Sequence, residues 1–589
     1  MSLVPDFIVL CVVWALAGLY TLAVFLSLTG ARGLNVDAVP PSERLGLSIV
    51  LAVLLLAIAN NFLSALVGSV VTAVVLLGAP VCHVLFAAWR RGWRALVAPL
   101  RPTLGRDAAA AGVSLVFILA IAHKLFFRRT LVANGLLYPD LPWHVGRVAE
   151  QAFHSTAGYW PLSPLAFPAS LPFVSFLADS LVSATFRYLP ISIETFTYTQ
   201  VLFCWVLVLW IAVVLVAGGG FWRALIVLTI AMFAIPALMF DASRVGLIVF
   251  IFFLANPNSA MAWPIGLALG FHLYQSHRRR TPPFALALAV IAPASLFFKA
   301  NQAFAFGFLQ AVGFALWMWT GRARDAFKWA AVAAGVWAAV IFASLAMGTW
   351  PPSKGINFSI ENFRRYALVA AQGRARNAVR WWGAYAALTA VVCALAASRK
   401  SVWRDVVIPI AALVAAMGYL ALGWFSVVPN GLAEGEPMHV NIELVMWIIT
   451  VIVAGAVWRL DARGPAVAIG VRGAALAAAV FMIWMVNTQP QDRGGIPIER
   501  NVEATNERRA RFALRTSIPD GHCFWYGRRY VIDVGGAFEP DAIIAATGCP
   551  VINGQRWRGY LGTNDPDALR AQTIIAVPSG PPFTMVRIR

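Results

Sequence analysis

The stretch "TYTQVLFCWVLVLWIAVVLV", residues 197–216, contains no charged side chain and scarcely a polar one after its first four residues. A helix needs about 20 consecutive apolar residues to cross the hydrocarbon core of a bilayer. Comparable runs recur along most of the chain. The sequence therefore predicts an all-α polytopic membrane protein.

We expect about fourteen transmembrane helices on this length criterion. They are predicted near residues 7–28, 47–66, 68–88, 109–127, 197–216, 222–240, 259–275, 283–298, 302–319, 327–347, 378–397, 404–423, 441–458 and 473–487.

The composition agrees with a membrane protein and argues against nucleic acid as a partner. Hydrophobic residues make up 60% of the chain and charged residues only 12%, against roughly 25% charged residues in soluble domains. The net charge of +20 comes largely from basic residues in short loops between apolar runs. Membrane topology explains such loops better than RNA or DNA binding does, and membrane lipids are the expected surroundings.

Five short connections are rich in basic residues, which usually marks the cytoplasmic side. They lie within residues 90–106, 278–280, 322–328, 399–404 and 459–472. With fourteen helices all five face the cytoplasm of a bacterial inner membrane, and both termini lie outside. The first helix has no basic residue before it and Arg32 after it, the pattern of an uncleaved helix rather than a cleaved signal peptide.

Three predicted outer segments are too long to be turns, and long loops of this kind usually carry function. They are residues 128–196, 348–377 and 488–589. We expect N-terminal helices over 1–108, a transmembrane core over 109–487 and a small extracytoplasmic α/β domain over 488–589. Its strands are predicted in "HCFWYGRRYVIDVG", "AIIAATGCPVI" and "TIIAVPSG", with a helix near 540–547. Cys523 and Cys549 lie in this domain, and an oxidising compartment predicts a disulfide between them.

The first outer segment contains "NGLLYPDLPWHVGRVAE", residues 134–150. Pro139 and Pro142 stiffen the backbone on either side of Asp140, so its carboxylate is presented from a rigid turn close to the membrane. One interpretation is a general base that acts on a substrate from the bilayer; the other is a helix cap at a surface turn. His144 is either a supporting group or a bystander. Further along, Asp179 interrupts the apolar face of a predicted interfacial helix.

These residues resemble the first outer loop of bacterial polytopic GT-C-fold glycosyltransferases. The likeness rests on "YPDLPWHVGRVAE" with its Asp-x-x-x-His pattern, and on "FPASLPFVSFLADSLVSA" with Pro-Phe-x-x-x-x-x-Asp. "NPNSAMAWPIGLALGFHLY", "FFKANQAFAFGF" and "ARFALRTSIPDGHCFWYGRR" also fit the layout of that family. The N-terminal 108 residues depart from members whose acidic loop follows their first helix.

The resemblance implies sugar transfer from a polyprenyl-phosphate-linked donor to a lipid or glycan acceptor on the outer face. It assigns to Asp140 the deprotonation of the acceptor, with inversion at the sugar. No cofactor is required. No DxD or ExD pair occurs, so no motif supports a divalent metal.

Other candidate residues have two interpretations each. Asp241 and Arg244 either contribute a second polar loop to the site or form an ordinary salt bridge. Lys299, followed by Asn301 and Gln302, either binds the donor phosphate or snorkels to the interface.

The second outer loop carries basic residues on the side of the membrane where they are disfavoured. These residues either bind the donor phosphate or bind anionic lipid headgroups. They include Arg364, Arg365, Arg374, Arg376 and Arg380.

The last predicted outer turn, "NGLAEGEPMHVNIE", holds Glu434, Glu436, His439 and Glu443 without a recognised metal-ligand spacing, so we expect a solvated turn.

Two other functions compete with sugar transfer. An O-antigen polymerase or ligase would use the arginine loop more than Asp140. A transporter or flippase would show matching halves and charges near mid-membrane, whereas here most charges lie in loops.

Overall fold

The computed structural model describes the helices and several short strands of the chain. The described residues are 4–29, 38–92, 98, 101–127, 144, 148, 151–152, 177–189, 195–234, 257–297, 300–346, 357–358, 386–398, 401–422, 426–427, 436–488, 530–533, 551–552, 573–576 and 586–587.

The described part of the chain contains nine helices that are long and apolar enough to cross a membrane, which confirms the polytopic class. Shorter apolar helices add to them at 177–186, 221–232, 285–297 and 386–396. A helix occupies all or part of each of the predicted positions. The number of crossings, about fourteen by the length criterion, stays a prediction.

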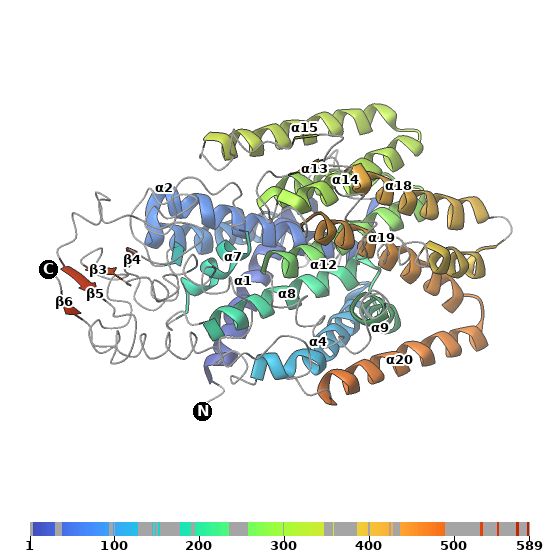
Figure 1. The fold of residues 1–589 in the computed structure, drawn as a ribbon, viewed down its shortest axis with the longest axis horizontal. Helices are drawn as coiled ribbons and strands as arrows, with labels where there is room; N and C mark the ends of the chain where they lie inside the picture. Colours follow the sequence, from blue (N-terminus) through green and yellow to red (C-terminus); the bar gives the residue numbers. More distant parts are fainter. Residues whose placement is uncertain are drawn as a thin grey trace.

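The helices run largely along the long axis of the molecule (Figure 1). Their bounds are α1 Val4–Thr29, α2 Pro41–Arg91, α4 Leu104–Phe127, α7 Leu177–Phe186, α8 Thr195–Val216, α9 Phe221–Thr229, α12 Pro257–Arg279, α13 Ala285–Ala294, α14 Ala300–Trp319, α15 Ala323–Ala346, α18 Ile408–Leu422, α19 Glu436–Asp461 and α20 Pro465–Thr488. A π-helical turn, Ile230–Ala234, continues α9, and another, Trp403–Val407, precedes α18.

Helix α2 is interrupted at Gly68, whose φ of 77° and ψ of 174° are not helical. Its two halves, Pro41–Ser64 and Val70–Arg91, are each long and apolar enough to span. The Tyr20 hydroxyl donates to the Leu76 carbonyl and Ser27 pairs with His83, both across 56 residues. This constant offset means that the second half of α2 runs parallel to α1. Two segments within 47–88 are therefore present, as the sequence predicts.

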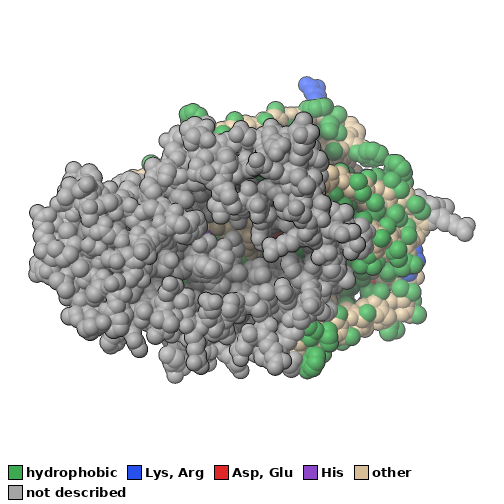
Figure 2. All heavy atoms as spheres, viewed as in Figure 1, with side chains coloured by type: hydrophobic (Ala, Val, Ile, Leu, Met, Phe, Trp, Pro, Cys, Tyr) green, Lys and Arg blue, Asp and Glu red, His purple; other side chains and the backbone are tan. Residues whose placement is uncertain are grey.

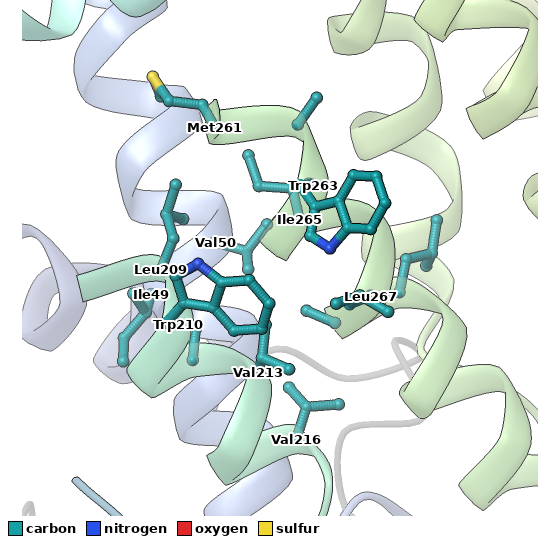
Figure 3. Packing of buried hydrophobic residues seen from close by; sticks show 14 of the residues in the cluster. Ile49, Val50, Leu209, Trp210, Val213, Val216, Met261, Trp263, Ile265 and Leu267 are labelled. Atoms are coloured by element: carbon teal, nitrogen blue, oxygen red, sulfur yellow. The ribbon is translucent and has the colours of Figure 1, made fainter. Parts of the chain in front are cut away.

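The core forms around α8, Thr195–Val216, which carries no charged side chain. Every residue of its Tyr198–Val216 window is buried, as expected for a helix that is apolar on all sides. Figure 3 shows Trp210 and Val213 of α8 beside Val50 of α2, with Ile265 of α12 close by. Helices α2, α8 and α12 thus make the centre of the bundle.

Close packing of α12 against α19 depends on glycine. A Cβ added at Gly266 would lie 2.6 Å from the Trp447 ring, and one at Gly455 would lie 2.2 Å from the Tyr274 ring. Small residues at a helix interface allow the backbones to approach, which is how helices associate where lipid replaces water.

The outer helices carry large exposed apolar side chains. Phe342 on α15 is 72% exposed and Ile469 on α20 is 73% exposed. Figure 2 shows hydrophobic side chains over much of the described surface that is visible in this view. On a soluble protein such a surface would be a binding patch or an aggregation hazard, whereas in a bilayer it is the surface that contacts lipid.

Contacts among the basic connections place them at one end of the bundle. The Gly220 amide donates to the Arg106 carbonyl, Arg279 pairs with Glu43 at the start of α2, and Arg278 pairs with Asp405. We call this end the basic side and the other end the opposite side. Helix α4 starts on the basic side and α8 ends there, so the end of α4 and the start of α8 lie on the opposite side.

Two groups of strands are described. The strand β1, Asn357–Phe358, pairs antiparallel with β2, Ser426–Val427. A four-stranded sheet of order β4-β3-β5-β6 is formed by β3 Tyr530–Asp533, β4 Val551–Ile552, β5 Thr573–Ala576 and β6 Val586–Arg587.

This sheet lies at the left end of Figure 1. Strand β3 is parallel to β4 and β5, and β6 is antiparallel to β5. Each of the three predicted strand sequences contains one of these strands. Parallel neighbours require crossover connections of a dozen or more residues. The predicted helix near 540–547 and both Cys523 and Cys549 lie outside the described residues.

Candidate functional site

A buried polar group on the opposite side joins His144 to α7 and α8. The Nδ1 atom of His144 lies 2.8 Å from Oδ1 of Asp179, and the hydroxyl of Tyr198 donates to the same oxygen at 3.1 Å. The rings of His144 and Tyr198 stack with their centroids 6.4 Å apart. The exposed fractions are 3% for His144 and 0% for Asp179 and Tyr198.

This geometry has a direct chemical consequence for the imidazole. A carboxylate only accepts hydrogen bonds, so the Nδ1 atom of His144 must carry the proton that it donates to Asp179. In the neutral ring Nε2 is then the nitrogen that can accept a proton. A histidine oriented in this way by a buried carboxylate is a familiar arrangement for proton transfer.

Arg187, directly after α7, ties this helix to α2. Its Nε donates to Oδ1 of Asn60 at 2.8 Å, and Nη2 donates to Oγ of Ser64 at 2.5 Å. It also donates to the carbonyl oxygens of Gln151 and Ala152, close to His144 in sequence. Burial lowers the pKa of Arg187 to about 10, so the guanidinium keeps its positive charge at neutral pH.

The residue after Asp179 adds a second attachment of α7 to α2. The Ser180 hydroxyl donates to the Ala57 carbonyl at 2.6 Å, and Nδ2 of Asn60 donates to the Ser180 carbonyl at 2.8 Å. Gln151 donates to Oδ1 of Asn61 at 2.7 Å. Because Ser180 and Arg187 both attach this segment to α2, the carboxylate of Asp179 is held in a defined position relative to α2.

A second polar group joins the starts of three helices on the opposite side. Nε2 of Gln302 on α14 lies 3.3 Å from Oγ of Ser259 on α12 and 3.2 Å from Oε2 of Glu443 on α19. These helices end on the basic side, so their first turns lie at the opposite end. Gln302 is three residues after Lys299, and Glu443 belongs to the stretch for which the sequence predicts a solvated turn. That expectation is wrong from Glu436 on, because residues 436–443 form the first turns of α19. Among the residues that the structure describes, no group of three His, Cys, Asp or Glu side chains could hold a metal.

His144 is the member of the predicted site that falls within the described residues, and it takes part in the buried group. The other predicted site residues lie outside them, namely Asp140, Asp241, Arg244, Lys299, Arg364, Arg365, Arg374, Arg376, Arg380, Cys523 and Cys549. Their roles stay predictions.

Three residues of this arrangement, Asp179, Tyr198 and Arg187, were not predicted to belong to a site. Two signals marked Asp179: it interrupts an apolar helix face, and it is the acidic residue of the Pro-Phe-x-x-x-x-x-Asp pattern. Tyr198 stands at the start of an apolar run, and Arg187 precedes "YLP". Neither position differs in sequence from an ordinary helix end. A partner 35 residues away along the chain, as His144 is from Asp179, cannot be inferred from local spacing.

The chain matches no protein-family model, no curated protein and no solved structure. A function for this protein is therefore inferred from its own residues.

Proposed function

We propose that this protein is an integral membrane glycosyltransferase of the GT-C type. It transfers a sugar, with inversion, from a polyprenyl-phosphate-linked donor to an acceptor on the outer face of the bacterial cytoplasmic membrane. The observation that carries this proposal is the buried pair of His144 and Asp179. The pair joins the Asp-x-x-x-His segment to the Pro-Phe-x-x-x-x-x-Asp segment, which are the two parts of the sequence that resemble this enzyme class.

In this proposal Asp140 is the general base. Its carboxylate takes the proton from the acceptor hydroxyl while the acceptor oxygen attacks the anomeric carbon and the lipid phosphate departs. His144 follows Asp140 by four residues and is fixed by Asp179 and Tyr198. A fixed His144 limits where the turn with Asp140 can lie, and such positioning is a large part of catalysis. His144 is thus a positioning residue for the base.

The departing phosphate requires cationic or hydrogen-bonding groups on the same side of the membrane. We assign this role to Lys299 and to arginines of the second outer loop, namely Arg364, Arg365, Arg374, Arg376 and Arg380. Arginine suits it because two parallel N–H bonds can reach one phosphate. Two observations support the assignment: Gln302 belongs to a polar group on the opposite side, and β1 fixes residues 357–358 against β2 just before α19.

The assignment is tested by single Gln substitutions of Lys299 and of each of these arginines, with donor binding measured on purified protein. If a residue contacts the phosphate, its substitution should weaken donor binding far more than it destabilises the fold. Unchanged donor affinity in every one of these variants would overturn the assignment.

A second candidate function is an O-antigen polymerase or ligase. The observation in its favour is the β1–β2 pairing, which holds residues 357–358, ahead of the arginines in sequence, beside residues 426–427. Such an enzyme would depend on the arginines and would tolerate loss of the Asp140 carboxylate. The same set of Asp140 and arginine variants therefore separates the two functions.

Finer features of the arrangement belong to the same proposal. The basic side faces the cytoplasm, and the opposite side, with the C-terminal α/β domain, faces outward. An oxidising compartment would allow the Cys523–Cys549 disulfide, and such bridges contribute about 2–4 kcal/mol.

A further inference from the structure

An apolar groove lies between α12, α14, α18 and α19, away from the group around His144. Its deep end is formed by Gly270, Phe308 and Trp447, and its other end by Leu316, Ile408 and Ile452. The groove is partly open to the surface, and its lining is almost entirely apolar. Such a lining suits a hydrocarbon chain rather than a polar ligand.

The groove extends through the half of the bundle nearest the basic side. Phe308 and Leu316 on α14 both line it, and at 1.5 Å per residue they are separated by about 12 Å. Half of the hydrocarbon core is about 15 Å thick. The groove therefore matches the depth of one acyl chain in the leaflet that faces the basic side.

Tyr274 and His277 line the end of the groove where the charged side chains begin. Nη1 of Arg459 donates to the Tyr274 hydroxyl at 2.7 Å, and Nε2 of His277 lies 3.3 Å from the Arg404 carbonyl oxygen. The mouth of the groove thus lies beside Arg404, just before α18, and Arg459, in the last turn of α19.

Positive charge is in excess at this mouth. Asp405 is 3% exposed and pairs with Arg278, with Arg459 at 3.7 Å and with Arg404 at 3.8 Å. Three guanidinium groups thus surround this carboxylate. The side chains of Arg278 and Arg404 remain 29% and 32% exposed. An anionic headgroup at the mouth would balance part of the excess while its chain occupies the groove.

We propose that this groove is a binding site for one anionic phospholipid of the cytoplasmic leaflet. One acyl chain lies along α14 and α18, and the phosphodiester contacts Arg404 and Arg278. Charge complementarity favours an anionic headgroup over a zwitterionic one, because a phosphate that is already paired with a choline adds no net negative charge. The site lies on the basic side and does not depend on sugar transfer at the opposite side.

The matched pair of substitutions is Ala412→Phe and Ala411→Phe. Ala412 lines the groove, whereas its neighbour Ala411 is exposed and does not line it. A phenyl group at position 412 fills the groove, and the same group at position 411 starts about 100° away around α18. At the mouth, Arg404→Gln removes one cation, and Arg322→Gln removes an exposed cation of another basic connection as its control.

Native mass spectrometry of the full-length protein in detergent measures the binding. The three probes are phosphatidylglycerol, phosphatidylcholine with the same acyl chains, and a polyprenyl phosphate. We expect the wild type to bind phosphatidylglycerol more tightly than phosphatidylcholine. Arg404→Gln should weaken phosphatidylglycerol binding roughly tenfold, because it removes one charge-assisted contact. Ala412→Phe should weaken it by a similar factor, because the phenyl group takes the space of the acyl chain. The two controls should bind as the wild type does.

Equal binding of phosphatidylglycerol and phosphatidylcholine would contradict the role of the cations. Binding of polyprenyl phosphate with no binding of phosphatidylglycerol would contradict the choice of ligand. If Ala412→Phe fails to fold, the Arg404→Gln comparison decides: wild-type affinity in that variant overturns the site.

Discussion

His144 and Asp179 stand 35 residues apart in the sequence, yet Nδ1 of the first and Oδ1 of the second lie 2.8 Å apart in a buried pair. Tyr198 adds a hydrogen bond to the same oxygen, and Arg187 and Ser180 hold the helix that carries Asp179 against α2. His144, four residues after the predicted base Asp140, therefore belongs to a group built from side chains of α7 and α8, and α7 is itself attached to α2.

Replacement of Asp179 by Asn tests whether the pair positions the base. The amide keeps the shape of the side chain but cannot hold the Nδ1 proton of His144 as a carboxylate does. We expect a loss of sugar transfer on the order of 10²-fold, typical of a misplaced catalytic group. Tyr198→Phe, which removes one hydrogen bond, should cost less.

A double-variant comparison separates positioning from simple stability. Residues that act through one another are not additive, so Asp179→Asn should add little loss of activity to His144→Ala. Fully additive losses in transfer rate would mean that Asp179 does not act through His144.

Arg187→Met should destabilise the protein because it removes the donor of four part-buried hydrogen bonds. Hydrogen bonds to a charged group are worth about 1.5–3 kcal/mol each, so a loss of at least about 2 kcal/mol is expected. Denaturation in detergent measures it. Arg91→Met, at an exposed arginine at the end of α2, is the control and should change stability little. Equal stability of the two variants would mean that the Arg187 contacts do not hold α7 in place.

Gly266→Ala tests the close approach of α12 and α19. The added methyl group would meet the Trp447 ring, and overpacking of this kind typically costs about 1–3 kcal/mol. Gly473→Ala is the matched control because a Cβ there meets nothing within 4 Å, and it should be neutral or slightly stabilising. A neutral Gly266→Ala variant would show that the helices can separate there at no cost.

Membrane orientation is tested with single cysteines in a background that lacks the native thiols. Arg322 is exposed on the loop between α14 and α15, which the charge pattern assigns to the cytoplasm. Thr563 lies in the C-terminal segment assigned to the outside. An impermeant thiol reagent applied to intact cells should label Thr563→Cys and spare Arg322→Cys. The reverse pattern would invert the topology.

Hydropathy and charge were sufficient to predict the membrane class and the positions of the helices. Residues 197–216 become the buried α8 because a helix that is apolar on every face has no polar side to turn to water. The strands β3, β4 and β5 were likewise predicted, since their short β-branched runs are bounded by turn residues.

The partners within the site could not be predicted in the same way. His144 was identified from its spacing to Asp140, whereas the pairing with Asp179 depends on how α7 packs against α2 and α8. The tie between Arg187 and Asn60 spans 127 residues, and neither residue has a local motif. Only the tertiary packing of the helices brings such residues together.

The measurement that tests the central claim most directly is the rate of sugar transfer by Asp140→Asn. The substitution keeps size and polarity and removes the basic oxygen, and general bases typically contribute about 10²–10⁴-fold in rate. We predict that Asp140→Asn abolishes turnover while expression, behaviour in detergent and donor binding stay near normal, and that His144→Ala loses less activity. Transfer by Asp140→Asn at near wild-type rate would contradict this account and would point to the arginine loop instead.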